Sequence, residues 1–349
     1  MQNAAINSGA KPPVANKKTN KVLVKLIRTI LTPEIGMLIP IIIVCLLTNN
    51  ANPVFLTWKF FSKLLVNSVP IGMMALGQAL VTLCGDVDLS VGMNGCFAGI
   101  MMGVACDKWG LTAVAGSPAL GIVACILVGV ASGALIGAVN GFLTSKLKLS
   151  AWITTLATQF ICKGLVTTIS KGITLDVKAL GTKAFKDARP LSLSWLFIIF
   201  VCIIILLEII VRRTQFGYKL RAVGGNPNAA TMGGISVDRI RFLAFLFAGI
   251  LAALSGVFET IQQQKAIPTS GEGREFRTII CVSIGGLSAG YGSIFGCAVG
   301  ILLYHVVVRA LEVLGWDKML QLVLIGAILI VAVLMDIMRK RFEAKQVAK

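Results

Sequence analysis

Long apolar stretches follow one another along most of this 349-residue chain, separated by short polar segments. A helix of about 20 mostly apolar residues can span the hydrocarbon core of a bilayer. The sequence therefore predicts an all-α polytopic membrane protein with about ten transmembrane helices. The stretch at 276–290 is short and rich in glycine, which indicates a broken or re-entrant helix. The expected spans are 29–48, 64–84, 89–106, 119–143, 151–169, 194–211, 240–262, 276–290, 293–314 and 319–337.

The charges agree with a membrane protein once their positions are considered. Only 14% of residues are charged, against about 25% in soluble domains, yet the net charge is +18. An even number of spans puts both termini on one side, and 19 of the 33 Lys and Arg residues lie on that side. The positive-inside rule makes this side cytoplasmic, with basic tails at 1–28 and 338–349. The basic loop at 170–193 runs against this bias. Nucleic acid is not needed to explain the charge.

Two glycine-interrupted segments resemble each other at an offset of 201 residues. Paired interrupted helices are typical of transporters built from two repeats, although glycines also serve ordinary helix packing. We expect a transmembrane domain at 29–337 with a first half at about 64–169 and a second at about 240–337. The matching pairs are Val81 and Val282, Gly85 and Gly286, Gly95 and Gly296, Cys96 and Cys297, Gly99 and Gly300, and Ile100 and Ile301.

Two carboxylates lie in the segment that joins the second and third spans. Charged groups at the centre of a membrane helix are unfavourable, so Asp86 and Asp88 are expected near a helix end, paired, or facing water. Asp88 is placed either to cap a helix that begins at Leu89 or to act in gating or solute contact. We expect Asp86 to face a cavity or a basic partner.

A short helix is predicted in the loop at 212–239, on the cytoplasmic side. Asn226 is a favourable N-cap and Pro227 fits the first helical position. A turn is expected before it at Gly224-Gly225, and Gly233-Gly234 ends it. With its small surface residues such a helix could insert into a cleft on another protein, or it could be a simple surface helix. Its body comprises Asn228, Ala229, Ala230, Thr231 and Met232.

From about residue 64 to 337 the chain resembles permease subunits of bacterial ATP-driven (ABC) importers for simple sugars, the ribose, galactose and xylose group. The resemblance implies a second permease copy or paralogue, ATPase subunits on the cytoplasmic face, an external solute-binding protein, and the bacterial inner membrane. It rests on Ala75-Leu76-Gly77 with Asp86 to Gly92, Gly137 to Gly141 with Ile153 to Thr158, Thr214 to Ile235, and Ser283 to Gly296.

The resemblance also assigns roles to residues of this chain. The family's Glu-Ala-Ala coupling segment falls on Asn228, Ala229, Ala230 and Gly234, with Asn in place of the acid. The expected ATPase-coupling residues are Gly225, Asn226, Pro227, Asn228, Ala229, Ala230, Gly233 and Gly234. The expected translocation path or gate comprises Gly85, Asp86, Asp88, Ser90, Asn94, Asn140, Thr154, Thr155, Gln159, Gly285 and Gly286, of which Asn140 and Thr154 rest partly on the resemblance.

Two segments depart from the family pattern. Ala151-Trp152 replaces a usual Pro-Phe, and Arg274-Glu275-Phe276-Arg277 replaces an acidic stretch before the eighth span. The basic change would contact the binding protein through Arg274, Glu275 and Arg277, or favour an anionic solute. The alternative is an ion pair of Glu275 with Arg274 or Arg277.

Other classes of function lack their usual signatures. No Gly-Lys dipeptide occurs, so the chain has no P-loop. We therefore expect no enzyme and no cofactor or metal on this chain, with ATP and magnesium on a partner. The spans contain few ionisable residues for a proton relay, which disfavours the alternative of an ion-coupled secondary transporter or channel. Glu208 is expected to pair with Arg212 or Arg213, Arg309 with Glu312, and His305 to pack in an apolar span.

Overall fold

A computed structural model describes residues 37–111, 117–177 and 194–317, together with a few residues between 319 and 334. The predicted basic tails lie outside the described residues, as does most of the 170–193 loop. The elements are α3 (Leu38–Ala51), α4 (Trp58–Leu83), α5 (Val91–Asp107), α7 (Pro118–Ser145), α8 (Ala151–Ser170), β1 (Leu175–Asp176), α10 (Trp195–Arg213), α11 (Gln215–Gly225), α12 (Pro227–Met232), α13 (Val237–Gln263), β2 (Lys265–Ala266), α14 (Arg274–Ile284) and α15 (Ile294–Val313).

The described part of the chain is mostly helical, which confirms the all-α membrane fold. Five of its helices, α4, α7, α10, α13 and α15, are long and apolar enough to cross a membrane, and α3 and α5 are shorter apolar helices. The helix expected at 276–290 is indeed broken, because α14 ends at Ile284. The first and the tenth expected spans both lie partly outside the described residues, so the count of ten stays a prediction.

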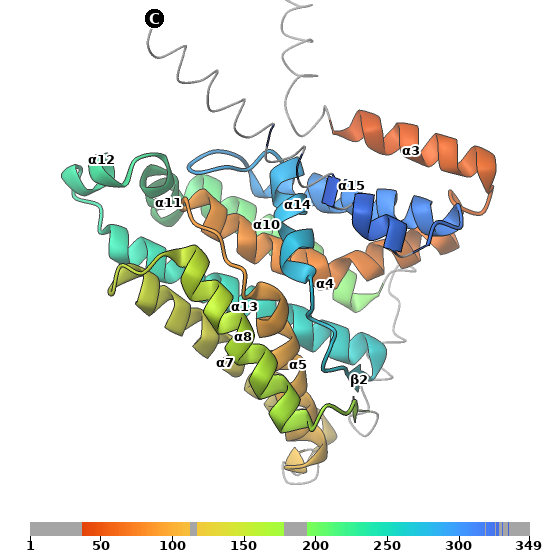
Figure 1. The fold of residues 1–349 in the computed structure, drawn as a ribbon, viewed down its shortest axis with the longest axis horizontal. Helices are drawn as coiled ribbons and strands as arrows, with labels where there is room; N and C mark the ends of the chain where they lie inside the picture. The colour runs from red at the N-terminus through yellow and green to blue at the C-terminus, as the bar shows by residue number, and fades with distance from the viewer. Residues whose placement is uncertain are drawn as a thin grey trace, which may run out of the picture.

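Helices α7 and α13 pack closely together, and glycines make the approach possible. Gly129, Gly133, Gly137 and Gly141 recur every fourth residue and so share one face of α7. A Cβ atom on Gly137 would lie 2.6 Å from the carbonyl oxygen of Phe245. Small residues that let helix backbones touch are typical of membrane proteins. In Figure 1, α13 runs through the centre, with α12 and β2 at its opposite ends.

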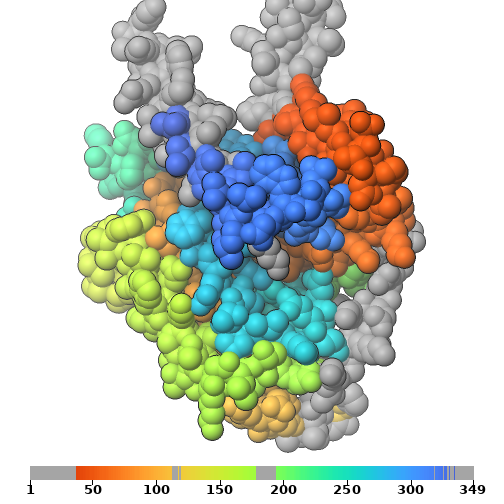
Figure 2. All heavy atoms as spheres, turned by 45° about the vertical axis from the view of Figure 1, so that its right-hand side comes forward, coloured from red at the N-terminus to blue at the C-terminus, as the bar shows by residue number. Residues whose placement is uncertain are grey.

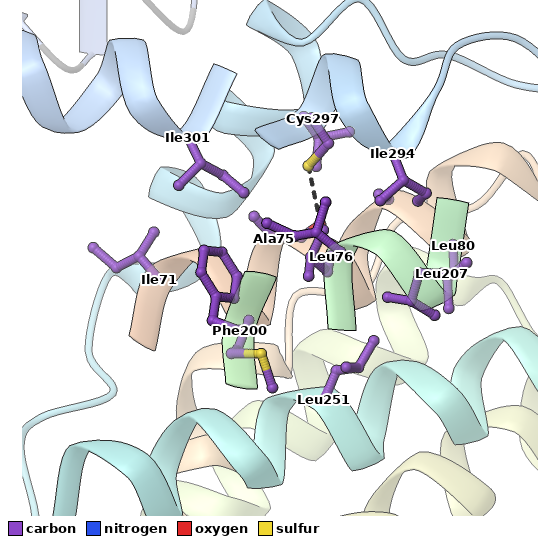
Figure 3. Close-up of a cluster of buried hydrophobic side chains, with 14 of the residues drawn as sticks. Ile71, Ala75, Leu76, Leu80, Phe200, Leu207, Leu251, Ile294, Cys297 and Ile301 are labelled. Carbon is purple, nitrogen blue, oxygen red and sulfur yellow. Dashed lines mark hydrogen bonds between the residues drawn. The ribbon is translucent and has the colours of Figure 1, made fainter. Parts of the chain in front are cut away.

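One apolar core joins helices that are far apart in sequence. Figure 3 shows side chains of α4, α10, α13 and α15 pointing toward one another, with the Cys297 thiol 3.6 Å from the carbonyl oxygen of Ala75. Leu76 and Ile294 are completely buried there. A smaller cluster packs α3 against α15 through Ile41 and Val306, and the two helices lie side by side in Figure 2. The core therefore fixes the second half of the chain against α4.

The segments related by the 201-residue offset share one backbone conformation where their first helix ends. After α4, Cys84, Gly85 and Asp86 donate from their amides to Leu80, Thr82 and Val81. After α14, Gly285, Gly286 and Leu287 donate to Cys281, Ser283 and Val282, which are the same positions shifted by 201. Gly85 and Gly286 both have positive φ, at 93° and 74°. We call residues 84–90 the first turn and residues 285–293 the second turn.

Candidate functional site

The first turn carries the most buried carboxylate of the site. Asp88 is 1% exposed, and its Oδ1 accepts hydrogen bonds from the amide and the hydroxyl of Ser90 at 2.8 and 2.7 Å. Burial raises the pKa of the Asp88 carboxyl to about 6. The expectation that Asp88 caps a helix beginning at Leu89 is wrong, because α5 begins two residues later at Val91. The carboxylate instead fixes the turn that leads into α5.

A chain of hydrogen bonds runs from Asp88 through Ser90 to two further elements, α7 and α8. The side-chain amide of Asn140 on α7 donates to the Ser90 hydroxyl at 2.9 Å. The Thr158 hydroxyl on α8 donates to Asn140 Oδ1 at 2.6 Å. Each of these side chains is at most 4% exposed. We call Asp88, Ser90, Asn140 and Thr158 the polar network. It holds the first turn, α7 and α8 together among apolar helices.

The face of α8 that carries Thr158 has other polar contacts. The Thr155 hydroxyl accepts from the amide of Leu89 at 3.0 Å. Gln159 donates to the buried carboxylate of Glu275 on α14 at 2.7 Å. Within the described part of the chain, three buried oxygens beside this face have no hydrogen-bond partner, namely Asp88 Oδ2, Thr154 Oγ1 and Glu275 Oε2. Oxygens of this kind can accept hydrogen bonds from the hydroxyls of a solute.

Asn94, another expected path residue, lies apart from this network. Its amide donates to the carbonyl oxygen of Gly133 at 3.2 Å, and the side chain is 1% exposed. It therefore joins α5 to α7 at the glycine face of α7. Most expected path residues do come together, but Asn94 has a helix-packing contact.

Asp86, also in the first turn, has a basic partner, as expected. The Arg241 guanidinium on α13 contacts both oxygens of the Asp86 carboxylate, at 2.6 and 3.1 Å. Burial raises the pKa of the Asp86 carboxyl, and the nearby Arg241 charge opposes this effect. The ion pair ties the first turn to the beginning of α13.

The loop between α10 and α13 contains the short helix that the sequence predicts. Asn226 Oδ1 accepts from the amide of Ala229 at 3.0 Å, and Pro227 occupies the first position of α12. The helix ends at Met232, before Gly233-Gly234. The turn expected at Gly224-Gly225 is wrong, because both glycines belong to the last turn of α11. Asn228 and Met232 are exposed, whereas Ala230 is buried against the core.

A cavity of about 1080 Å³ opens beside α12, between the end of α7 and the beginning of α13. Its wall carries more basic than acidic side chains. Asp238, its acidic group, pairs with Lys148. The charged lining residues are Lys146, Lys148, Asp238, Arg239 and Arg241.

A smaller cavity of about 230 Å³ lies at the opposite end of α13. Glu259 forms a two-point ion pair with Arg274, with one contact at 2.6 Å. The ion pair expected between Arg274 and Glu275 is therefore wrong, because these neighbours on a helix point in different directions. Glu275 turns inward to Gln159, and Arg277 is partly buried. A contact of this segment with a binding protein stays a prediction.

The second turn has no acidic residue of its own, and Glu208 from α10 supplies the charge. Glu208 Oε2 accepts from the amides of Ile294 and Phe295 at 2.8 and 3.1 Å, which caps the beginning of α15. The expected pairing of Glu208 with Arg212 is confirmed. The expected pairing of Arg309 with Glu312 is confirmed as well. The carboxylate of Glu208 thus joins α10 to the helix that follows the second turn.

Three important side chains were not predicted as site residues. Thr158 lies one helical turn after Thr154, so the spacing on α8 could have indicated it. Arg241 and the capping contact of Glu208 come from distant parts of the chain, and no local pattern indicates them. No group of three or more His, Cys, Asp or Glu residues suited to a metal ion occurs among the described residues.

Comparisons with known proteins identify the family of this chain. The family described as the permease component of branched-chain amino acid transport systems matches residues 60–333. The chain is 33% identical over 314 residues to the ribose import permease protein of Bacillus subtilis, covering 88% of this chain and 92% of that protein. It is 30% identical to the L-arabinose transport system permease protein of Escherichia coli, over 76% of this chain and 78% of that protein.

A third relative is the fructose import permease protein of Rhizobium meliloti, 30% identical over 84% of each chain. No solved structure matches the chain. The family match and the apolar helices together define a multi-pass membrane transport subunit. The chain belongs to the permease family named above, and it is a transport component rather than an enzyme.

Proposed function

We propose that this chain is the membrane permease of an ATP-driven importer that takes up a simple sugar. The polar network is the observation that carries the proposal. Four hydrogen-bonded side chains from three segments lie buried among apolar helices, beside three oxygens without partners in the described structure. Buried polar groups in membrane helices mark solute pathways. The curated relatives described above are sugar import permeases.

The proposed transporter has two permease copies or paralogues, two ATPase subunits and an external binding protein. Both termini are cytoplasmic, and ten spans form two related halves. The ATPase, which carries ATP and magnesium, contacts the exposed residues of α12. The binding protein docks at the end of the molecule that carries β1 and β2. The proposed path passes Asp88, Asn140 and the Thr154 to Gln159 face of α8, between the two cavities.

Uptake by the complete transporter in proteoliposomes tests the proposal. Labelled ribose, arabinose and fructose are offered with the binding protein outside and ATP inside. Thr158→Val removes the hydroxyl that bonds Asn140, so we expect roughly fivefold slower uptake, since a hydrogen bond contributes about 1 kcal/mol. Thr167→Val is the matched control, because Thr167 lies on an exposed part of α8.

Two outcomes would contradict the proposal. Uptake that continues without ATP and requires an ion gradient would favour a secondary transporter. If Thr158→Val and Thr167→Val took up sugar equally fast, the polar network would not belong to the solute path.

The docking surface is tested separately at Met232, which is 91% exposed on α12. We expect Met232→Asp to lower the amount of ATPase that copurifies with the permease. Ile173→Asp, at an exposed apolar residue beyond α8, is the control and keeps the ATPase bound. Equal ATPase recovery in both variants would place docking elsewhere.

A further inference from the structure

The end of α11 makes direct backbone contact with the end of α4. A Cβ atom on Gly224 would lie 2.0 Å from the carbonyl oxygen of Leu83, the last residue of α4, so only glycine fits there. Gly224 lies two residues before Asn226, the N-cap of α12. The segment that leads into α12 therefore rests directly on the helix that leads into the first turn.

The second turn meets the same point. The amide of Gly290 donates to the carbonyl oxygen of Leu83 at 3.1 Å. A Cβ atom on Gly290 would lie 2.8 Å from both the carbonyl oxygen of Arg221 and the amide of Gly225. Because each of the three segments touches both others, α11, the end of α4 just before the first turn, and the second turn meet in one contact, which we call the glycine junction.

Side chains around the glycine junction keep α11 and α12 from moving independently of the core. Leu220 and Val223 of α11 are completely buried, and Ala230 of α12 is 6% exposed. They belong to the same core cluster as Leu83 and Leu287. Close-packed interiors transmit displacement because they leave few voids to absorb it. A shift of α12 must therefore displace the two turns or break this packing.

Each turn leads to a different part of the structure. The first turn continues within a few residues to Asp88 and its polar network. The second turn continues into α15, whose beginning is capped by Glu208 of α10. We infer that Gly224, Leu83 and Gly290 are positioning residues that transmit movement of α12 directly to both turns. The inference rests on the proposed function, because it assumes that the ATPase moves α12.

Hydrogen–deuterium exchange on the complete transporter tests this route in the wild-type protein. Exchange of α12 and of both turns is compared with and without a non-hydrolysable ATP analogue. We expect the analogue to change exchange in α12 and in both turns together. A change in α12 with unaltered turns would overturn the inference and leave the proposed function standing. No change in α12, even when the ATPase subunits assemble, would overturn the proposed function and the inference with it.

Gly224→Ala adds the methyl group that the junction has no room for. We expect ATP hydrolysis to continue while sugar transported per ATP falls roughly tenfold, which is within the usual range for coupling substitutions. Gly290→Ala is a second variant with the same expected direction. Gly164→Ala on α8 is the matched control, because nothing lies within 4 Å of a Cβ atom there. Unchanged transport per ATP in a folded Gly224→Ala transporter would overturn the inference, and the wild-type exchange experiment decides if the variant does not fold.

Discussion

The two turns of this permease have the same backbone ending but different chemistry. The helices before them end with the same three hydrogen bonds and a glycine at positive φ. The first turn then carries two carboxylates, one paired with Arg241 and one at the head of the polar network. The second turn has none, and Glu208 from another helix caps α15. The two turns therefore share a backbone conformation, although only the first turn carries carboxylates.

The largest expected effect on stability is at Glu208, the residue that caps the helix after the second turn. Glu208→Ala removes the acceptor of one buried and one partly buried amide and an ion-pair partner, so we expect a loss of about 3 to 4 kcal/mol in the free energy of unfolding. Thermal unfolding of the purified permease measures it. Glu208→Gln keeps an acceptor oxygen and should lose less. Equal losses in the two variants would mean that charge, rather than the cap, matters at α15.

A second, somewhat smaller effect belongs to the first turn alone and depends on pH. The pKa of folded Asp88, about 6, is above the ordinary value of 3.8. Stability from this group is therefore fully present below the ordinary pKa and lost as pH rises through about 6. We expect Asp88→Asn to remove this loss, worth roughly 2 to 3 kcal/mol above that range. Unfolding temperatures measured between about pH 4 and pH 8 check it, and parallel curves for both proteins would contradict it.

A third prediction compares the two glycines directly. Gly85→Ala and Gly286→Ala each place a side chain at positive φ, so each should cost about 1 kcal/mol of stability. We expect only Gly85→Ala to slow uptake strongly, because its turn leads to the polar network. Gly172→Ala, at φ 70° after α8, is the control for strain outside the turns. Equal slowing by Gly286→Ala would show that both turns serve the path.

The smallest effect is expected at the exposed ion pair beside α12. Lys148 and Asp238 have side chains 61% and 36% exposed, so solvent screens their attraction. Lys148→Ala should change the free energy of unfolding by less than about 0.5 kcal/mol. Thermal unfolding checks this value, and a loss near that of Glu208→Ala would contradict it.

The short helix α12 could be predicted from sequence because local rules define it. Asn226 caps it, Pro227 fits its first position, and glycines end it. The neighbouring Gly224-Gly225 was mispredicted as a turn because local preference does not include tertiary contact. Gly224 is helical and needs its missing side chain for the approach of Leu83. The same residue type thus serves chain reversal in one place and packing in another.

The candidate site was predictable in its polar members but not in its contacts. Asp88, Ser90 and Asn140 were expected from their polarity within or beside apolar spans, and the structure joins them. The partner Thr158 lies on a helix whose rotation depends on packing against α5 and α7. Asn94 met the same polarity criterion but contacts a backbone carbonyl. Polarity indicates which residues need partners, and only the fold selects those partners.

The two-residue strand pair at the far end of α13 has a mechanical consequence. Leu175 pairs with Ala266, and Asp176 with Lys265, so the chain after α8 is fastened to the chain after α13. A rod held at one end moves most at the other. Thr154 lies sixteen residues from Ser170 at the fastened end of α8, a lever of about 24 Å at 1.5 Å per residue. A rotation of about 5° about the strand pair would displace Thr154 and its neighbour Thr155 by about 2 Å, enough to break the hydrogen bond that Thr155 accepts from the Leu89 amide.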